Sequence, residues 1–147
     1  MNLKQLVVMS AVAVATGCTS SQQHTRTPFD EYPVYEGESV EMAYTPASTR
    51  FSLWAPSAQE VRVLLYEKGQ GGSAYRMVKM EPESDGMWQA RVNEDLKGKF
   101  YTFNVKIDDV WQGDTPGLMA KAVGVNGDRA AVIDWKETNP EGWNEDK

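Results

Sequence analysis

Apolar and polar residues alternate with a period of two at several places beyond residue 34, and this alternation predicts β-strands rather than helices. It is clearest over 99–107, where positions 101, 103, 105 and 107 are apolar and positions 102, 104 and 106 are polar. Further strand patterns cover 50–55, 60–67, 75–80, 87–92, 110–112 and 130–134. Most of the chain is therefore expected to consist of short strands.

Turn signals separate these strand patterns: Pro56, the glycine-rich loop 68–72, Asp85-Gly86 and Asp108-Asp109. The pattern contains no amphipathic helix of useful length, and residues 118–122 are expected to form a single helical turn. Short strands with turn signals every 8–12 residues are typical of a β-sandwich. We predict an all-β fold, an immunoglobulin-like β-sandwich of about seven short strands, over residues 34–135.

The first seventeen residues have a different pattern. An apolar run of about ten residues, Leu6–Ala15, follows Lys4; it is too short to span a bilayer and matches the core of a signal peptide. It leads into Ala15-Thr16-Gly17-Cys18, which resembles a bacterial lipobox, where the leader is cut before the Cys and the thiol carries a diacylglycerol. We expect residues 1–17 to be a lipoprotein signal peptide and Cys18 to anchor the protein to a bacterial membrane, facing the periplasm or the cell surface. A plain secretory signal with a chance Cys is the alternative.

The segments on either side of the predicted sandwich differ from it in composition. Residues 18–33 are polar without an apolar period, which predicts a tether. Residues 136–147 are charged, contain Pro140 and Gly142, and predict no element. We expect 136–147 to be a linker.

Length and charge narrow the range of possible functions. The chain has 147 residues with 15 Lys+Arg against 21 Asp+Glu, a formal net charge of −6. This length suits one ordinary domain, and a surface for nucleic acid would need a clustered excess of Lys and Arg. We therefore expect no nucleic-acid partner.

The residues by themselves supply no catalytic constellation. The single His24 lies in the tether, and the single Cys18 is expected to be acylated, so neither a nucleophile–His pair nor a zinc site is expected. Residues 69–72 lack the Lys-Ser/Thr of a phosphate loop, and the acidic stretches 81–85 and 108–109 lack the ligand spacing of a calcium loop. We expect no metal, no cofactor and no catalytic residue in this chain.

Aromatic residues are the remaining signal, with five Trp and six Tyr. Exposed aromatic rings stack on the apolar faces of sugar rings, so they suit glycan binding. Trp54 and Trp88 lie inside strand patterns and are expected in the core, whereas Trp111 lies beside a turn, where core and surface are equally open. Trp135 and Trp143 follow the last strand pattern and are expected to pack on a neighbour.

Four blocks of the sequence resemble the N-terminal domain of glycoside hydrolase family 13 debranching enzymes. Residues 51–58 follow the pattern Phe-x-x-Trp-Ala-Pro-x-Ala, and residues 85–88 with 98–105 continue it. Residues 121–134 and 138–143 resemble type I pullulanases in particular. The resemblance implies a sandwich of the carbohydrate-binding module family 48 (isoamylase N-terminal) type, placed ahead of a (β/α)₈ barrel that hydrolyses α-1,6 branch points.

The resemblance also implies a role and partners. The chain is expected to be the α-glucan-associated N-terminal module of a pullulanase-like hydrolase, cut off before the catalytic barrel that carries the Asp nucleophile and Glu acid/base. Its expected ligands are starch, glycogen or pullulan. Two alternatives remain open: a stand-alone α-glucan-binding lipoprotein, and a generic immunoglobulin-like protein-interaction domain.

The same resemblance implies candidate sugar contacts. Relatives that bind glycogen use a Trp after a turn, which matches Trp111, and a Lys in the preceding strand, where this chain has Thr102. They use a further Trp in a loop that corresponds to residues 67–71. Trp88 is a third candidate if its ring reaches the surface. Residues 123–129 are a candidate contact with the barrel.

Overall fold

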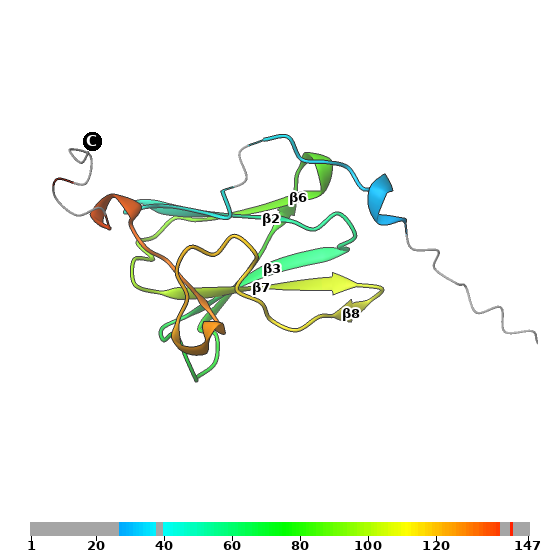
Figure 1. Cartoon of the computed structure of the whole chain (residues 1–147). Helices are drawn as coiled ribbons and strands as arrows, with labels where there is room; N and C mark the ends of the chain where they lie inside the picture. The colour runs from blue at the N-terminus through cyan, green and yellow to red at the C-terminus, as the bar shows by residue number, and fades with distance from the viewer. Residues whose placement is uncertain (1–26, 38–39, 139–141, 143–147) are drawn as a thin grey trace, which may run out of the picture.

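Two antiparallel sheets face each other in the computed structural model, which describes residues 27–37, 40–138 and 142 (Figure 1). The first sheet, called the β2 sheet here, has the order β1-β2-β6-β5, and the second, the β3 sheet, has the order β4-β3-β7-β8, with β9 also paired to β7. The strands are β1 (Met42–Thr45), β2 (Ser48–Trp54), β3 (Glu60–Tyr66), β4 (Arg76–Lys79), β5 (Glu81–Pro82), β6 (Met87–Val92), β7 (Phe100–Ile107), β8 (Val110–Trp111) and β9 (Ala130–Ala131).

The predicted all-β sandwich is confirmed, with three differences in detail. β1 and β5 were not expected as separate strands, and the pattern at 130–134 forms only the two-residue β9. The helical turn expected at 118–122 is wrong, because those residues form turns and bends without a helix. The described helices are short 3₁₀ turns: η1 (Phe29–Glu31), η2 (Ser84–Gly86), η3 (Val125–Gly127) and η4 (Trp135–Glu137).

The core forms where the inward positions of the two sheets meet. Alternate residues of β3 and β7 point inward, and Val63 lies directly opposite Phe103 in the register of the two strands. From the other sheet, Phe51 packs its ring 5.0 Å from the centroid of Tyr101 and 6.5 Å from that of Phe103. These rings are buried and their tilted and edge-on contacts add to the gain from burying apolar surface. The outward positions of β3 and β7 are consequently free for polar residues.

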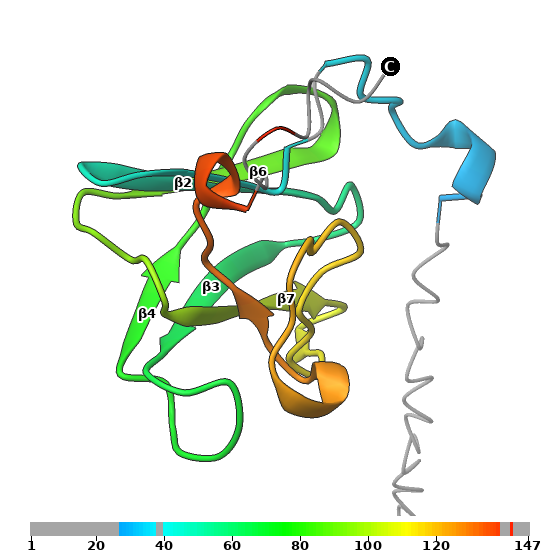
Figure 2. The same ribbon diagram turned by 60° about the vertical axis from the view of Figure 1, so that its left-hand side comes forward.

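A tight hairpin turn positions the end of the β3 sheet. Asp108 and Asp109 both have positive φ, 50° and 62°, which matches the backbone twist favoured in two-residue hairpins. The turn sends the chain back so that Trp111 lies opposite Lys106. Residues 112–131 then continue along the same edge of β7, where Thr115 and Phe103 exchange backbone hydrogen bonds of 2.7 and 2.9 Å (Figure 2). The β7 edge is therefore covered.

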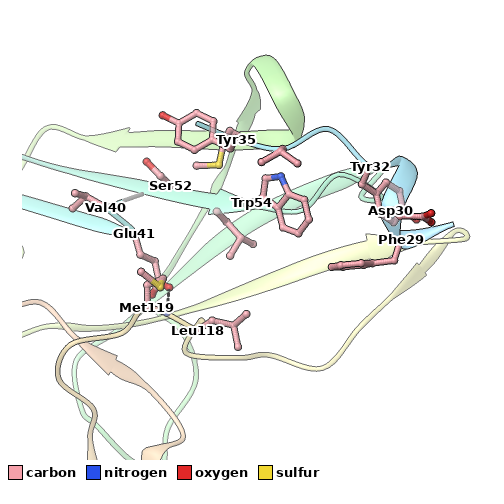
Figure 3. A pocket seen from close by; sticks show the side chains of 13 residues that line it. Phe29, Asp30, Tyr32, Tyr35, Val40, Glu41, Ser52, Trp54, Leu118 and Met119 are labelled. Carbon is pink, nitrogen blue, oxygen red and sulfur yellow. Dashed lines mark hydrogen bonds between the residues drawn. The ribbon is translucent and has the colours of Figure 1, made fainter. Parts of the chain in front are cut away.

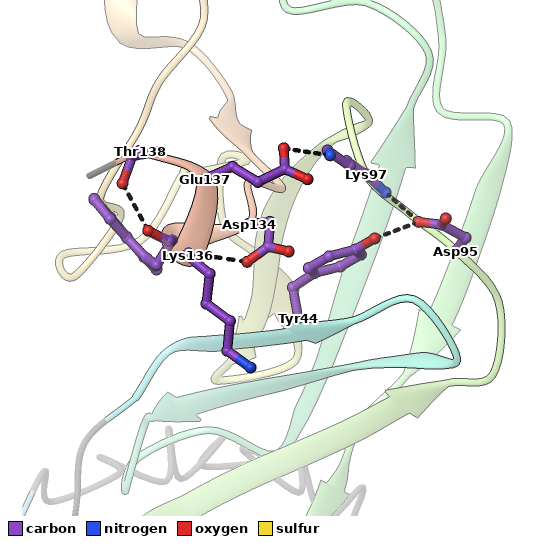
Figure 4. Close-up of polar contacts among 8 residues, drawn as sticks. Tyr44, Asp95, Lys97, Asp134, Lys136, Glu137 and Thr138 are labelled. Carbon is purple, nitrogen blue, oxygen red and sulfur yellow. Dashed lines mark hydrogen bonds and ion pairs between the residues drawn. The ribbon is translucent and has the colours of Figure 1, made fainter. Parts of the chain in front are cut away.

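The sequence predicted no helix or strand after residue 134. In the structure the segment after β9 forms the short helix η4 and is attached to the sandwich. The Asp134 carboxylate accepts the Lys136 N–H and caps η4, and Glu137 pairs with Lys97 at 2.5 Å (Figure 4). The Tyr44 hydroxyl donates to Asp95 at 2.8 Å in the same cluster. Residues 134–138 thus belong to the folded domain, at the end opposite η1 (Figure 1). None of the helices in the described ranges is both long and apolar enough to cross a membrane.

Candidate functional site

The outer face of the β3 sheet carries polar and aromatic side chains. In the strand register Arg62 lies opposite Asn104, Leu64 opposite Thr102, and Lys106 opposite Trp111. Because successive strand residues point to opposite faces, these residues share the face turned away from the core. The sequence therefore builds this face from the polar half of the alternation that builds the core.

Trp111 is the exposed aromatic residue of this face. Its side chain lies on the edge strand β8 and is 37% exposed. The Arg62 guanidinium lies 3.9 Å from the centroid of the indole, although β7 separates the two strands. Arg62 is itself held by a 2.9 Å hydrogen bond from its Nε to Asn104 Oδ1. The cation–π contact fixes the orientation of the ring and leaves over a third of the residue's surface open.

Polar groups surround this ring. Asn104 is buried, and its Nδ2 donates to the Gln112 carbonyl at 2.5 Å and to Asp114 Oδ1 at 2.8 Å. Lys106 and Glu60 pair at 2.9 Å; the pair lowers the pKa of Glu60 and raises the pKa of Lys106. The face thus combines a fixed aromatic ring with a neutral amide, a positive ammonium and a negative carboxylate.

Thr102 shares the outer face but is not brought together with Trp111. Its residue is only 2% exposed, and its hydroxyl lies 3.1 Å from the Tyr66 hydroxyl. The Arg129 guanidinium covers the Tyr66 ring at 3.6 Å. Thr102 is also four residues from Lys106, roughly 13 Å along the strand from the position of Trp111. The structure places it beneath other side chains.

Arg129 also holds the loop 67–72, where relatives were expected to carry a second Trp. It donates to the carbonyls of Lys68 and Gly71 at 2.7 Å and to that of Gly72 at 2.9 Å. Behind the loop, a Cβ on Gly124 would lie 2.7 Å from the Gly69 oxygen, so the two backbones pack with no room for a side chain. Sequence reasoning missed this clamp, because about sixty residues separate its partners.

Of the two tryptophans expected in the core, Trp88 lies there and Trp54 does not. Trp88, the third candidate, is 8% exposed in the core, and its indole N–H donates to the Ala55 carbonyl at 3.0 Å. Trp54, expected in the core, is instead 38% exposed, because Leu53 takes the inward position at the end of β2. Trp135 is 42% exposed with the Lys121 ammonium 5.1 Å from its ring. Cys18 and Trp143 lie outside the described residues.

A pocket lies between the N-terminal segment and the end of β2, apart from the outer face of the β3 sheet. This pocket, of about 480 Å³, is lined chiefly by apolar and aromatic residues, including Phe29, Tyr32, Trp54 and Leu118 (Figure 3). At its inner end the buried Glu41 accepts hydrogen bonds from the Tyr101 hydroxyl at 3.1 Å and the Met119 N–H at 2.8 Å. Burial raises the pKa of Glu41. Among the described residues no group of three His, Cys, Asp or Glu could hold a metal ion.

Comparison with known families identifies the class of this domain. The model of carbohydrate-binding module 48, described as the isoamylase N-terminal domain, matches residues 37–121. The chain therefore belongs to this family, as its resemblance to debranching enzymes predicted.

Its relatives are modules within much larger enzymes. The chain is 27% identical over 106 residues to a pullulanase of Klebsiella aerogenes, which covers 67% of this chain and 10% of that protein. It is 28% identical over 98 residues to the 1,4-alpha-glucan branching enzyme GlgB of Geobacillus stearothermophilus, covering 65% of this chain and 15% of that protein. The chain thus spans a tenth to a seventh of these relatives.

Solved structures agree. Pullulanase from Paenibacillus barengoltzii, solved with maltotriose, superposes with a TM-score of 0.76 at 44% identity, over 81% of this chain and 18% of that one. Pullulanase from Bacillus acidopullulyticus superposes with a TM-score of 0.74 at 30% identity, over 80% of this chain and 14% of that one. The chain is a carbohydrate-binding module 48 domain of the kind that pullulanases contain.

Proposed function

We propose that this domain binds α-glucan on the outer face of the β3 sheet, centred on Trp111, and serves a pullulanase-like enzyme that acts on α-1,6 linkages. The observation that carries the proposal is the exposed indole of Trp111, fixed by Arg62 on the polar face of a family 48 module. The similarity to pullulanases and to a branching enzyme supports the enzyme context.

The geometry suits a neutral polyol. The apolar C–H face of a glucose ring stacks on an indole, and the hydroxyls around its rim exchange hydrogen bonds with neighbouring polar groups. Lys106 and Glu60 offer such groups beside the ring. Because the ligand carries no charge, the net charge of −6 does not oppose binding, and we expect binding to depend little on salt.

Affinity electrophoresis of the full chain tests the binding. We expect gels containing amylopectin or pullulan to retard the protein relative to a gel without glycan, and Trp111→Ala to abolish the retardation. Trp135→Ala is the matched control, because Trp135 is similarly exposed but lies in η4. Wild-type protein that migrates equally in all three gels would leave the module only a structural role.

The enzyme context has its own test. Sequencing the gene beyond the codon for Lys147 is expected to find a (β/α)₈ hydrolase barrel on the same polypeptide. An unrelated gene there would instead favour a stand-alone α-glucan-binding protein.

We further propose that Cys18 carries the lipid that anchors the protein to a bacterial membrane. The support is the sequence alone, an apolar run followed by Ala15-Thr16-Gly17-Cys18. Labelled palmitate fed to a producing bacterium is expected to enter the wild-type protein and not Cys18→Ser. Equal labelling of both proteins would contradict the anchor.

A further inference from the structure

The pocket beside Trp54 is separate from the proposed glucan face. Its walls come from residues 29–35 and 40–41, the end of β2, Met87 and the turn at 118–119, whereas Trp111 and Arg62 do not line it. Its volume of about 480 Å³ lies within the range of small-molecule sites.

Three aromatic rings gather at one end of this pocket (Figure 3). The ring of Phe29 lies 6.4 Å from that of Tyr32 and 6.4 Å from that of Trp54, in both cases nearly perpendicular, at 85°. The indole N–H of Trp54 donates to the Asp85 carbonyl at 3.0 Å, which fixes that ring. Rings set at right angles around one space are the arrangement by which aromatic cages surround a cation.

The charges around the pocket have one sign. Asp30 and Glu41 are the acidic residues of its lining, and no Lys, Arg or His is among the described residues that line it. Both oxygens of Glu41 already accept hydrogen bonds, and the Trp54 N–H is taken by Asp85. Besides Asp30, the polar side chains left in the lining are the hydroxyls of Ser52, Tyr32 and Tyr35. The rest of the lining is apolar or aromatic, which suits methyl groups better than the many hydroxyls of a sugar, and the ring faces and Asp30 attract positive charge.

We propose that this pocket binds an organic cation that carries a methylated ammonium group. The methyl groups match the apolar lining. The positive charge of the ammonium group is attracted by the aromatic rings of Phe29, Tyr32 and Trp54 and by the acidic residue Asp30. A hydrated metal ion or a bare ammonium would have to give up its water shell to enter the same space.

Isothermal titration calorimetry of the full chain with choline tests the proposal. Its uncharged isostere, 3,3-dimethylbutan-1-ol, has the same shape without the charge. We expect choline to bind and the isostere to bind at least several-fold more weakly. Equal affinity for the two would show a merely apolar pocket and overturn the proposal, as would the absence of choline binding.

Variants locate the site. Trp54→Leu keeps an apolar side chain without the π face, and we expect it to weaken choline binding by roughly 3- to 30-fold. The separate variant Asp30→Asn is expected to weaken choline binding as well, most clearly at low salt. Trp135→Leu is the control and is expected to leave choline binding unchanged. Choline binding that survives Trp54→Leu intact would overturn the assignment.

Two further experiments distinguish this proposal from a lipid-headgroup site and from a glucan site. Flotation with phosphatidylcholine and phosphatidylglycerol vesicles distinguishes a lipid headgroup from a free ligand; binding to phosphatidylcholine alone identifies the headgroup as one source of the same chemistry. Trp54→Leu is expected to keep its retardation in amylopectin gels. Loss of that retardation would mean that the pocket holds glucan instead and would overturn the proposal. The choline titration is a separate measurement, and its outcome does not depend on whether Trp111 binds glucan.

Discussion

Arg129→Ala tests whether one side chain couples the far end of the chain to the β3–β4 loop. In the structure the guanidinium stacks on the Tyr66 ring and donates to three carbonyls, those of Lys68, Gly71 and Gly72. Alanine removes all four contacts. It also uncovers the buried pair of hydroxyls on Tyr66 and Thr102.

The magnitude follows from these contacts. A hydrogen bond to a charged group contributes roughly 1.5–3 kcal/mol when buried, and a cation–π contact about 0.5–1 kcal/mol at an exposed site. Arg129 is only partly buried and one guanidinium makes all three bonds, so we discount the sum to about 2–3 kcal/mol. For a domain of this size that corresponds to a fall in Tm of roughly 8–20 °C.

Thermal unfolding of the full chain followed by circular dichroism measures this loss. Arg129→Lys is expected to restore less than half of it, because one ammonium cannot reproduce the planar, many-donor guanidinium. Arg91→Ala, at an exposed strand position of β6, is the matched control and should change stability by less than about 0.5 kcal/mol. If Arg129→Ala lowers Tm no more than Arg91→Ala, the loop is not coupled to the fold in the way the contacts indicate.

Three further predictions concern the glucan face and the Glu41 cluster. Arg62→Ala should weaken amylopectin retardation several-fold while Tm falls by only a few degrees, because it frees the orientation of Trp111 without opening the core; unchanged retardation would refute this. Gly117→Ala should cost about 1–3 kcal/mol in chemical denaturation, since φ is +88° and the new Cβ would lie 2.5 Å from the Glu41 carboxylate. Burial raises the pKa of Glu41 above its ordinary 4.5, so the stabilisation tied to its proton is present below pH 4.5 and is lost as pH rises through the folded-state pKa. The stability of wild type relative to Glu41→Gln should therefore be greater at pH 4 than at pH 7, and a constant difference would contradict the raised pKa.

The strands were predictable because their period is a local property of the sequence. Segments 60–67 and 99–107 alternate or are continuously apolar, and both became strands buried on the core side. β1 lacks that signal, since only its pairing with β2, Met42 opposite Phe51, defines it. Propensity alone cannot indicate a strand whose stability comes from a neighbour.

The site was less predictable, for two different reasons. The placement of Trp54 was available from the sequence, because Phe51 and Leu53 already occupy the inward parity and Trp54 must then face outward. The contact of Arg62 with Trp111 was not available, since the two residues are brought together only by the order β3-β7-β8. Pairings of this kind depend on topology, which a single sequence does not specify.

The two aromatic surfaces suit different ligands because their polar surroundings differ. Beside Trp111 lie groups of both signs and an amide, with Arg62 on the ring itself, so a further cation would meet a positive charge already in place. Beside Trp54 the described lining is mostly apolar and aromatic, with two acidic residues and no basic one, so it favours a methylated cation over a ligand with many hydroxyls. Under the two proposals, the same kind of side chain serves as a platform for a polyol at Trp111 and as the wall of a cation site at Trp54. Exchanging the neighbouring charges, rather than the tryptophans, is what should exchange the ligands.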